Sequence, residues 1–199
     1  DWPRLLAAAL NEPGTGPTLS RRLRARTDGR VVIVVEDITR GGPVAEILSV
    51  VMREVRAAKI DPARVQVVFA TGMHPPMRAS HVARKLGEMA SIHWRCNPCE
   101  DREAYVSIGQ IGKLDLLVDR GVAEADLRII ISSVSPHFQA GFGGGYRLLV
   151  PGCAHVDTIR ELNRLGMEHP DRKYVGTEAE ANPMRSVIDA AGVMIDQRL

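Results

Sequence analysis

The sequence has no long apolar segment, few cysteines and little excess charge. None of its apolar runs approaches the roughly 20 residues that a membrane-spanning helix needs, so we expect no membrane partner. Three cysteines are an odd number for the disulfide scaffold of a secreted protein, so we expect reduced thiols and a cytoplasmic location. Lysine and arginine total 26 against 24 acidic residues, mixed along the chain, and we therefore expect no nucleic-acid partner.

The familiar nucleotide-binding motifs are also missing. No G-x-x-x-x-G-K-[ST] phosphate loop occurs in the chain. The glycine-rich segment GFGGGY, residues 141–146, has Tyr146 where the dinucleotide fingerprint needs its last glycine. Residues 133–140 also separate this segment from the strand that should lead directly into it. These departures argue against a conventional NAD enzyme and against a P-loop ATPase.

Three apolar, largely β-branched runs predict strands that are buried on both faces of a sheet, at residues 31–36, 65–70 and 127–132. Apolar residues recur at helical spacing over 43–58, and a second helix is expected over 77–90. This alternation predicts an α/β fold: a mostly parallel β-sheet with helices on both faces, three-layered and Rossmann-like. A chain of 199 residues is expected to form a single domain, residues 1–199.

The remaining segments are less regular. Helices are expected at residues 2–10, 158–165 and 183–191, and a short strand at 92–94. Residues 97–126 are expected to form a loop with a short strand at 114–118.

Polar residues follow each of the three strong strands. Because the carboxyl ends of parallel strands lie at one edge of a sheet, we expect these residues to share one cleft, where ligands bind in such folds. They are Asp37 and Arg40 after the first strand, Thr71, Gly72 and His74 after the second, and His137, Gly143, Gly144, Gly145 and Arg147 after the third.

These residue types suggest acid–base chemistry on an anion. Two histidines, His74 and His137, could act as general acid and base, because an unperturbed imidazole has a pKa near 6.5. Arg40 could hold a carboxylate or phosphate through two parallel hydrogen bonds, and Asp37 could orient Arg40 or cap the next segment. The glycines could present backbone N–H groups to an anion. Taken singly, each feature also has a structural interpretation: a turn, a hydrogen-bonded loop histidine, or a flexible connection.

A partial zinc pattern, H-x-x-C-x-x-C, is formed by His93, Cys96 and Cys99. A closed structural zinc site needs a fourth ligand, and no second cysteine pair follows. Cys153 or His155 could serve only if folding brought them near. We therefore expect ordinary reduced thiols and no metal ligand set.

Five motifs together resemble the N-terminal domain of the nickel-pincer-dependent lactate racemase family, long catalogued as a domain of unknown function. They are DITRGGP (37–43), TGMHPPM (71–77), PHFQAGFGGGYRLLVPG (136–152), TIRELN (158–163) and ANPMR (181–185). The resemblance implies an α/β domain followed by a C-terminal domain that is absent from this chain, so we expect a fragment of a longer protein. It implies a nickel-bound pyridinium mononucleotide that takes a hydride from a 2-hydroxy acid and returns it to either face.

By motif position, the resemblance makes His74 and His137 the two histidines that exchange the hydroxyl proton. It assigns Asp37 and Arg40 to the cofactor and substrate region, and it brings the glycine-rich loop close to the cofactor. Two positions depart from the family pattern: Arg147 replaces a lysine that carries the cofactor through a thioamide, and Asn163 replaces a histidine nickel ligand. A guanidinium is a weak nucleophile and a neutral amide is a poor nickel ligand.

The resulting hypothesis is a lactate racemase-like domain, an isomerase, that acts on a 2-hydroxy acid by acid–base and hydride chemistry with altered cofactor use. The nickel-pincer nucleotide would then be bound without a covalent link. The alternative is a diverged, non-catalytic binding module for an anionic small molecule or a nucleotide-like cofactor. A third hypothesis is dehydration or elimination on a hydroxy acid with the same two histidines.

Overall fold

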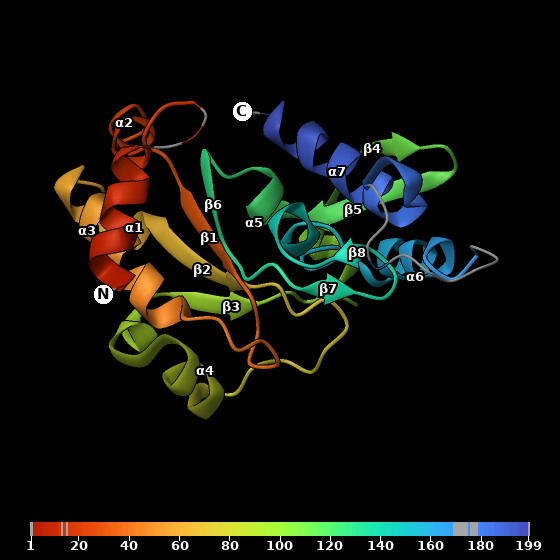
Figure 1. Cartoon of the computed structure of the whole chain (residues 1–199), viewed down its shortest axis with the longest axis horizontal. Helices are drawn as coiled ribbons and strands as arrows, with labels where there is room; N and C mark the ends of the chain where they lie inside the picture. The colour runs from red at the N-terminus through yellow and green to blue at the C-terminus, as the bar shows by residue number, and fades with distance from the viewer. Residues whose placement is uncertain (1, 13, 15, 169–174, 176–178, 199) are drawn as a thin grey trace.

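The computed structural model describes all residues except 1, 13, 15, 169–174, 176–178 and 199. Its centre is a four-stranded parallel sheet in the order β3-β2-β1-β6 (Figure 1). The strands are β1 (Val31–Val35), β2 (Val65–Phe69), β3 (Trp94–Cys96) and β6 (Leu127–Ile131). Val31 pairs with Val65 on one side and with Leu127 on the other, so the three strong strands start level with one another. The predicted parallel sheet is confirmed.

Successive side chains of β1 point to opposite faces and enter two separate cores. Val31, Ile33 and Val35 pack beneath α2 (Leu19–Arg24), α3 (Val44–Ala57) and α4 (Ala79–Leu86). The helix α1 (Trp2–Asn11) lies against α3 on that side (Figure 1). Val32 and Val34 enter the other core, which α5 (Arg120–Ala123), α6 (Val156–Leu165) and α7 (Pro183–Asp196) help to close. The predicted three-layer α/β arrangement is therefore confirmed.

The prediction for residues 97–126 was wrong in part, because this segment contains an antiparallel hairpin. Its strands are β4 (Tyr105–Ile111) and β5 (Leu114–Asp119), and it packs on the second core rather than joining the central sheet. The pairing shifts between Ser107 and Gln110, and Gly109 has φ 133° at that point. This bulge interrupts the alternation of apolar and polar residues, which is the signal by which β4 could have been recognised.

Two shorter strands complete the fold near the glycine-rich segment. They are β7 (Pro136–His137) and β8 (Gly141–Phe142), which pair with each other and precede a 3-10 turn at Gly145–Leu148. Within the described residues, no helix has the length and apolar character needed to cross a membrane.

Candidate functional site

The loops that follow β1, β2 and β6 surround one cleft of about 330 Å³ at the carboxyl edge of the sheet. Figure 1 shows the loop after β2 passing beside β7. The cleft brings together most of the residues predicted from sequence: Asp37, Arg40, Thr71, Gly72, His74, His137, Gly143, Gly144 and Arg147, with Asn163 also on its wall. Gly145 is not among the lining residues.

His74 is held by the carboxylate of Asp37. The Nδ1 atom of His74 lies 2.5 Å from Oδ2 of Asp37, and the histidine side chain is 52% exposed whereas that of Asp37 is 6% exposed. Burial opposes ionisation of Asp37, but hydrogen bonds from Thr39 and His74 outweigh it and lower the pKa of the carboxyl group. An ionised Asp37 accepts the Nδ1–H of His74, which leaves Nε2 as the proton acceptor.

Asp37 therefore has a partner that differs from the one considered in the sequence analysis. Its other oxygen, Oδ1, accepts hydrogen bonds from the backbone N–H and the hydroxyl of Thr39, so it does cap the following segment. It forms no ion pair with Arg40 among the described residues. The side chain that Asp37 orients is therefore His74, and not Arg40.

The second histidine, His137, lies in a different electrostatic environment. Its Nδ1 lies 3.2 Å from the backbone nitrogens of both Gln139 and Ala140, and its Nε2 lies 2.7 Å from Nη2 of Arg147. Burial, followed by the charges of Arg147 and Arg40, lowers the pKa of His137 to about 4. His137 is therefore neutral at pH 7, whereas a carboxylate supports His74.

Two guanidinium groups face this cleft. Burial and the nearby charges of Arg40 and Arg185 lower the pKa of Arg147 to about 10, which still leaves it protonated at pH 7. The Nε atom of Arg147 is buried and has no hydrogen-bond partner. Arg40 is exposed, and its backbone carbonyl accepts a 2.5 Å hydrogen bond from Lys85.

The glycine cluster is explained largely by the path of the chain. Gly144 has φ 85°, and a Cβ atom there would lie 2.6 Å from the carbonyl oxygen of Ser133. Gly145 has φ 57° and open space around it. The N–H of Gly143 bonds to Ser135 O and that of Gly145 to Ser132 Oγ, so these two groups already have partners within the chain. Among the four glycines of residues 141–145, Gly143 alone combines an ordinary φ with a place on the cleft wall.

The loop after β2 is held in place by hydrogen bonds to neighbouring segments of the chain. The hydroxyl of Thr71 donates to the Asn97 carbonyl at 3.4 Å, and the backbone N–H of Gly72 donates to Gly152 O at 2.9 Å. The buried Asn97 side chain also donates to Ala154 O and accepts from the hydroxyl of Tyr105 at 2.7 Å. Thr71 and Gly72 thus set the position of the His74 loop.

A buried ion pair of Glu36 with Lys85, which was not predicted from the sequence, lies beside the cleft. Glu36 accepts hydrogen bonds from Ser133 and from the backbone of Gly42, and its carboxylate lies 3.4 Å from the Lys85 nitrogen. Burial opposes ionisation of Glu36, but the bonds from Ser133 and the charge of Lys85 outweigh it and lower its pKa. Lys85 also donates to the carbonyl of Arg40, so this network positions the Arg40 loop. The available signal was a carboxylate at the end of the run VVIVVE.

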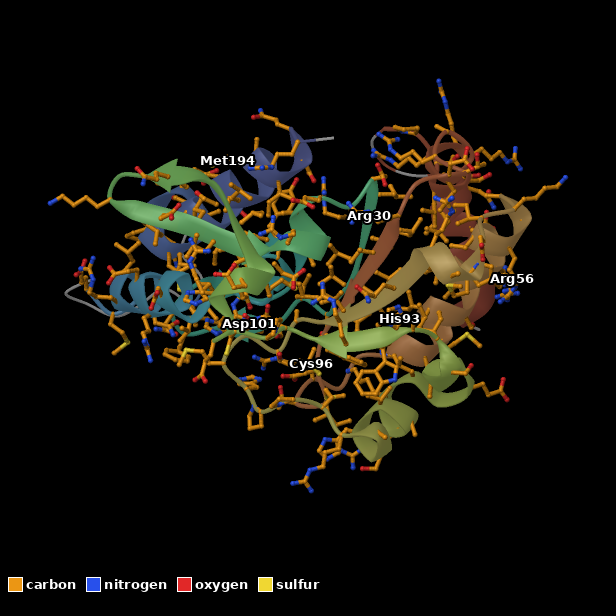
Figure 2. All side chains as sticks on the ribbon, turned by 180° about the vertical axis from the view of Figure 1, so that it is seen from behind. Arg30, Arg56, His93, Cys96, Asp101 and Met194 are labelled. Carbon is orange, nitrogen blue, oxygen red and sulfur yellow. The ribbon has the colours of Figure 1, made fainter. Side chains whose placement is uncertain are left out.

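The partial zinc pattern does not form a cluster: His93 directly precedes β3, Cys96 ends it, and Cys99 lies in the turn that follows. Figure 2 shows His93 and Cys96 at opposite ends of this strand. Side chains three positions apart on a strand point to opposite faces. His93 contacts Gln66, whereas the Cys96 sulfur accepts the backbone N–H of Met77 at 3.2 Å. Within the described residues, no group of three or more His, Cys, Asp and Glu side chains could hold a metal ion.

The donor set does not fit a covalently attached nickel cofactor. At the position of the lysine implied by the resemblance, Arg147 offers a guanidinium, which does not form a thioamide link under ordinary conditions. Asn163, at the position of the metal-binding histidine, offers a neutral amide. The nearby Lys85 is buried and already bonded to Glu36 and to the Arg40 carbonyl. We therefore derive no reaction step through the nickel group.

The chain is similar to known proteins in both sequence and structure. A family model described as "Lactate racemase N-terminal domain" matches residues 3–174. The lactate racemase of Lactiplantibacillus plantarum is 33% identical over 138 residues, which are 68% of this chain and 32% of that protein. The lactate racemase of Thermoanaerobacterium thermosaccharolyticum is 31% identical over 151 residues, 72% of this chain and 34% of that protein. The matched part of the chain thus spans about a third of these curated relatives.

Solved structures share the fold. The lactate racemase apoprotein from T. thermosaccharolyticum superposes with a TM-score of 0.85 at 24% identity, over 97% of this chain and 46% of that one. A protein from Thermotoga maritima superposes with a TM-score of 0.74 at 20% identity, over 90% of this chain and 47% of that one. At these identities the structural likeness speaks for the fold alone.

Proposed function

Because this chain belongs to the lactate racemase N-terminal domain family, we propose that its cleft acts on a 2-hydroxy acid by proton transfer at the 2-hydroxyl group. The observation that carries the proposal is the Asp37–His74 pair, which faces the same cleft as His137 and the Arg40 guanidinium. A carboxylate-supported imidazole is an effective proton acceptor near neutral pH.

In this proposal His74 and His137 are both catalytic but have unequal roles. The Nε2 atom of His74 takes the hydroxyl proton and returns it, while Asp37 stabilises the imidazolium that forms. Arg40 binds the carboxylate beside the hydroxyl. His137 stays neutral and faces the substrate from its own side of the cleft. Removal of the α-hydrogen as a hydride needs an acceptor that none of these side chains supplies, so the proposal concerns the proton half of the reaction.

Any nickel-pincer nucleotide used by this chain is proposed to bind without a covalent link, because Arg147 stands at the attachment position. The test is the intact mass and the nickel content of full-length protein purified from cells that make the cofactor. We expect the mass of the unmodified polypeptide. The double variant Arg147→Lys with Asn163→His should gain nickel. Added cofactor mass on the unaltered protein, or a double variant without nickel, would contradict this part of the proposal.

The chain is proposed to form one α/β domain whose cleft a further domain of a longer polypeptide covers. Met73 and Phe138 line the cleft but remain 49% and 65% exposed, and the nearby Val134 is 75% exposed. Exposed apolar side chains at the rim of a cleft are typical of surfaces that another domain covers. The three cysteines are free thiols, which supports a proposed cytoplasmic location.

Activity is tested with the full-length protein and a panel of single-enantiomer 2-hydroxy acids. Chiral chromatography measures stereochemical scrambling, and the same samples are assayed for 2-oxo acids and for loss of water. We expect His74→Gln to lower turnover by about a hundredfold or more, the usual contribution of a positioned general base. His93→Gln is the matched control, because His93 is exposed and contacts Gln66 outside the cleft. Turnover that survives His74→Gln would overturn the assignment.

A binding module without turnover is the second candidate. It is favoured by one observation: Arg147 and Asn163 replace the two residues on which the implied cofactor depends. Such a module would be protected from heat by hydroxy acids or phosphate. It would leave every acid in the panel unchanged.

A further inference from the structure

The cleft holds more positive charge than its own carboxylates neutralise. Glu36 is paired with Lys85 and Asp37 with His74. Arg185, the next guanidinium in the region, is paired with Asp189 at 2.6 Å. Within the part of the chain that the structure describes, no carboxylate forms an ion pair with Arg40 or Arg147. Two like charges therefore face one cavity, and each makes it less favourable to keep the other guanidinium charged.

The hydrogen bonds of Arg147 are also incomplete. Its buried Nε–H has no partner, and its Nη2 faces Nε2 of His137. The opposite ring nitrogen, Nδ1, faces two more donors, the N–H groups of Gln139 and Ala140. A neutral imidazole accepts at one nitrogen only, so one ring N–H must point at another donor. Burying a polar group without a suitable partner is costly, and this corner of the cleft therefore favours an acceptor.

We propose that Arg147 and Nε2 of His137 together bind a second anionic group of the substrate, so that the substrate is a 2-hydroxy acid that also carries a carboxylate or phosphate. This proposal rests on the proposed function, in which Arg40 binds the carboxylate beside the hydroxyl. Nη2 and Nε2 lie only 2.7 Å apart, so an anionic oxygen that accepts from both groups lies beside the pair, on the cleft side. Nδ1 is then free to accept the two backbone N–H bonds.

The shape and charge of the cleft agree with this substrate class. A volume of about 330 Å³ suits a small acid, since it is near the low end of the roughly 300–1,000 Å³ of small-molecule sites. With one anionic group at each guanidinium, the substrate neutralises both charges. A monocarboxylate such as lactate neutralises only one of them.

Binding is measured by isothermal titration calorimetry on the full-length protein at pH 7. The probes are malate, 3-phosphoglycerate and lactate, which share the 2-hydroxy acid group and differ in the second anionic group. We expect malate or 3-phosphoglycerate to bind at least about tenfold more tightly than lactate, because a hydrogen bond to a charged group contributes that much or more. Whichever of the two binds more tightly identifies the second group as carboxylate or phosphate.

Two variants test the assignment to Arg147. Arg147→Met should reduce dianion affinity by about tenfold to a hundredfold and leave lactate affinity little changed. Arg147→Lys keeps the charge but loses the planar fork and should recover part of the affinity. Arg56→Gln is the matched control. Arg56 is an exposed arginine in the last turn of α3, and it does not line the cleft. Circular dichroism checks that each variant is folded.

The outcomes separate the two proposals. Equal affinity for malate, 3-phosphoglycerate and lactate, or a dianion affinity that Arg147→Met leaves intact, overturns the second anion site even if His74-dependent turnover is found. Dianion binding that depends on Arg147, without turnover of any 2-hydroxy acid, supports this site and overturns the proposed catalysis. Absence of binding by all three probes at millimolar concentration overturns the second anion site.

Discussion

Replacing Arg147 by methionine should raise the pKa of His137, because a positive charge 2.7 Å from Nε2 opposes protonation of the ring. Burial, Arg147 and Arg40 together lower this pKa from 6.5 to about 4. At about 1.4 kcal/mol for each pKa unit, the lowering corresponds to roughly 3 kcal/mol. A unit charge at about 4 Å contributes from about 1 to about 4 kcal/mol, depending on how well water screens it. Burial remains in the variant, so we expect a rise of at least about one pKa unit.

The same shift has a consequence for stability. The pKa of His137 is lower in the folded than in the unfolded protein, so between pH 6.5 and pH 4 the unfolded protein binds more protons. The contribution of the neutral His137 ring to the free energy of unfolding is thus fully present above pH 6.5 and is lost as the pH falls to about 4. The free energy of unfolding of Arg147→Met should fall less steeply across this window.

The assay is a pH titration of the histidine ring resonances by NMR, with His137 assigned from the His137→Gln variant. Urea unfolding at pH 7 and pH 4.5 measures the stability difference. His93, which is exposed, provides the reference titration in the same spectra. A His137 pKa near 6.5 in the unaltered protein, or the same low pKa in Arg147→Met, would refute the reasoning.

Three further predictions concern the framework of the cleft, and urea denaturation measures all of them. Gly144→Ala should destabilise the protein by about 2 kcal/mol or more, because its φ is 85° and the new Cβ would lie 2.6 Å from Ser133 O. Gly143→Ala should leave stability within about 0.5 kcal/mol, because the new Cβ makes only ordinary contacts; a loss as large as that of Gly144→Ala would contradict the ordinary backbone conformation and the open surroundings of Gly143. Arg95→Met should cost about 3 kcal/mol, since it leaves the buried carboxylate of Asp119 without its 2.5 Å partner, and an unchanged midpoint would show that this pair does not join β3 to β5.

The sequence was sufficient to predict the sheet and the place of the cleft. Runs such as VVIVV, with apolar residues for both faces, are typical of a parallel sheet covered on both sides, and the carboxyl ends of such strands share one edge. His74 and His137 could therefore be placed together without knowledge of any contact. The glycine bulge at Gly109 hid the strand β4, because it broke the period on which recognition depends.

Pairings between loops could not be predicted. Asp37 reaches His74, and Glu36 reaches Lys85, across long stretches of chain whose relative position depends on the register of β1 and β2. The sequence spacing of Asp37 and Arg40 suggested a local pair that the fold does not form. The electrostatic difference between the two histidines likewise arises from tertiary neighbours and leaves no mark in the local sequence.

The central claim is that a 2-hydroxy acid lies in one cleft with its hydroxyl at His74 and an anionic group at His137. The most direct measurement is the NMR response of the histidine rings to malate and to succinate, which lacks only the hydroxyl. We predict that malate shifts the resonances of both His74 and His137 with one common saturation curve, that succinate shifts His137 far more than His74, and that neither shifts His93. Malate binding that leaves the His74 resonances unmoved would contradict the account.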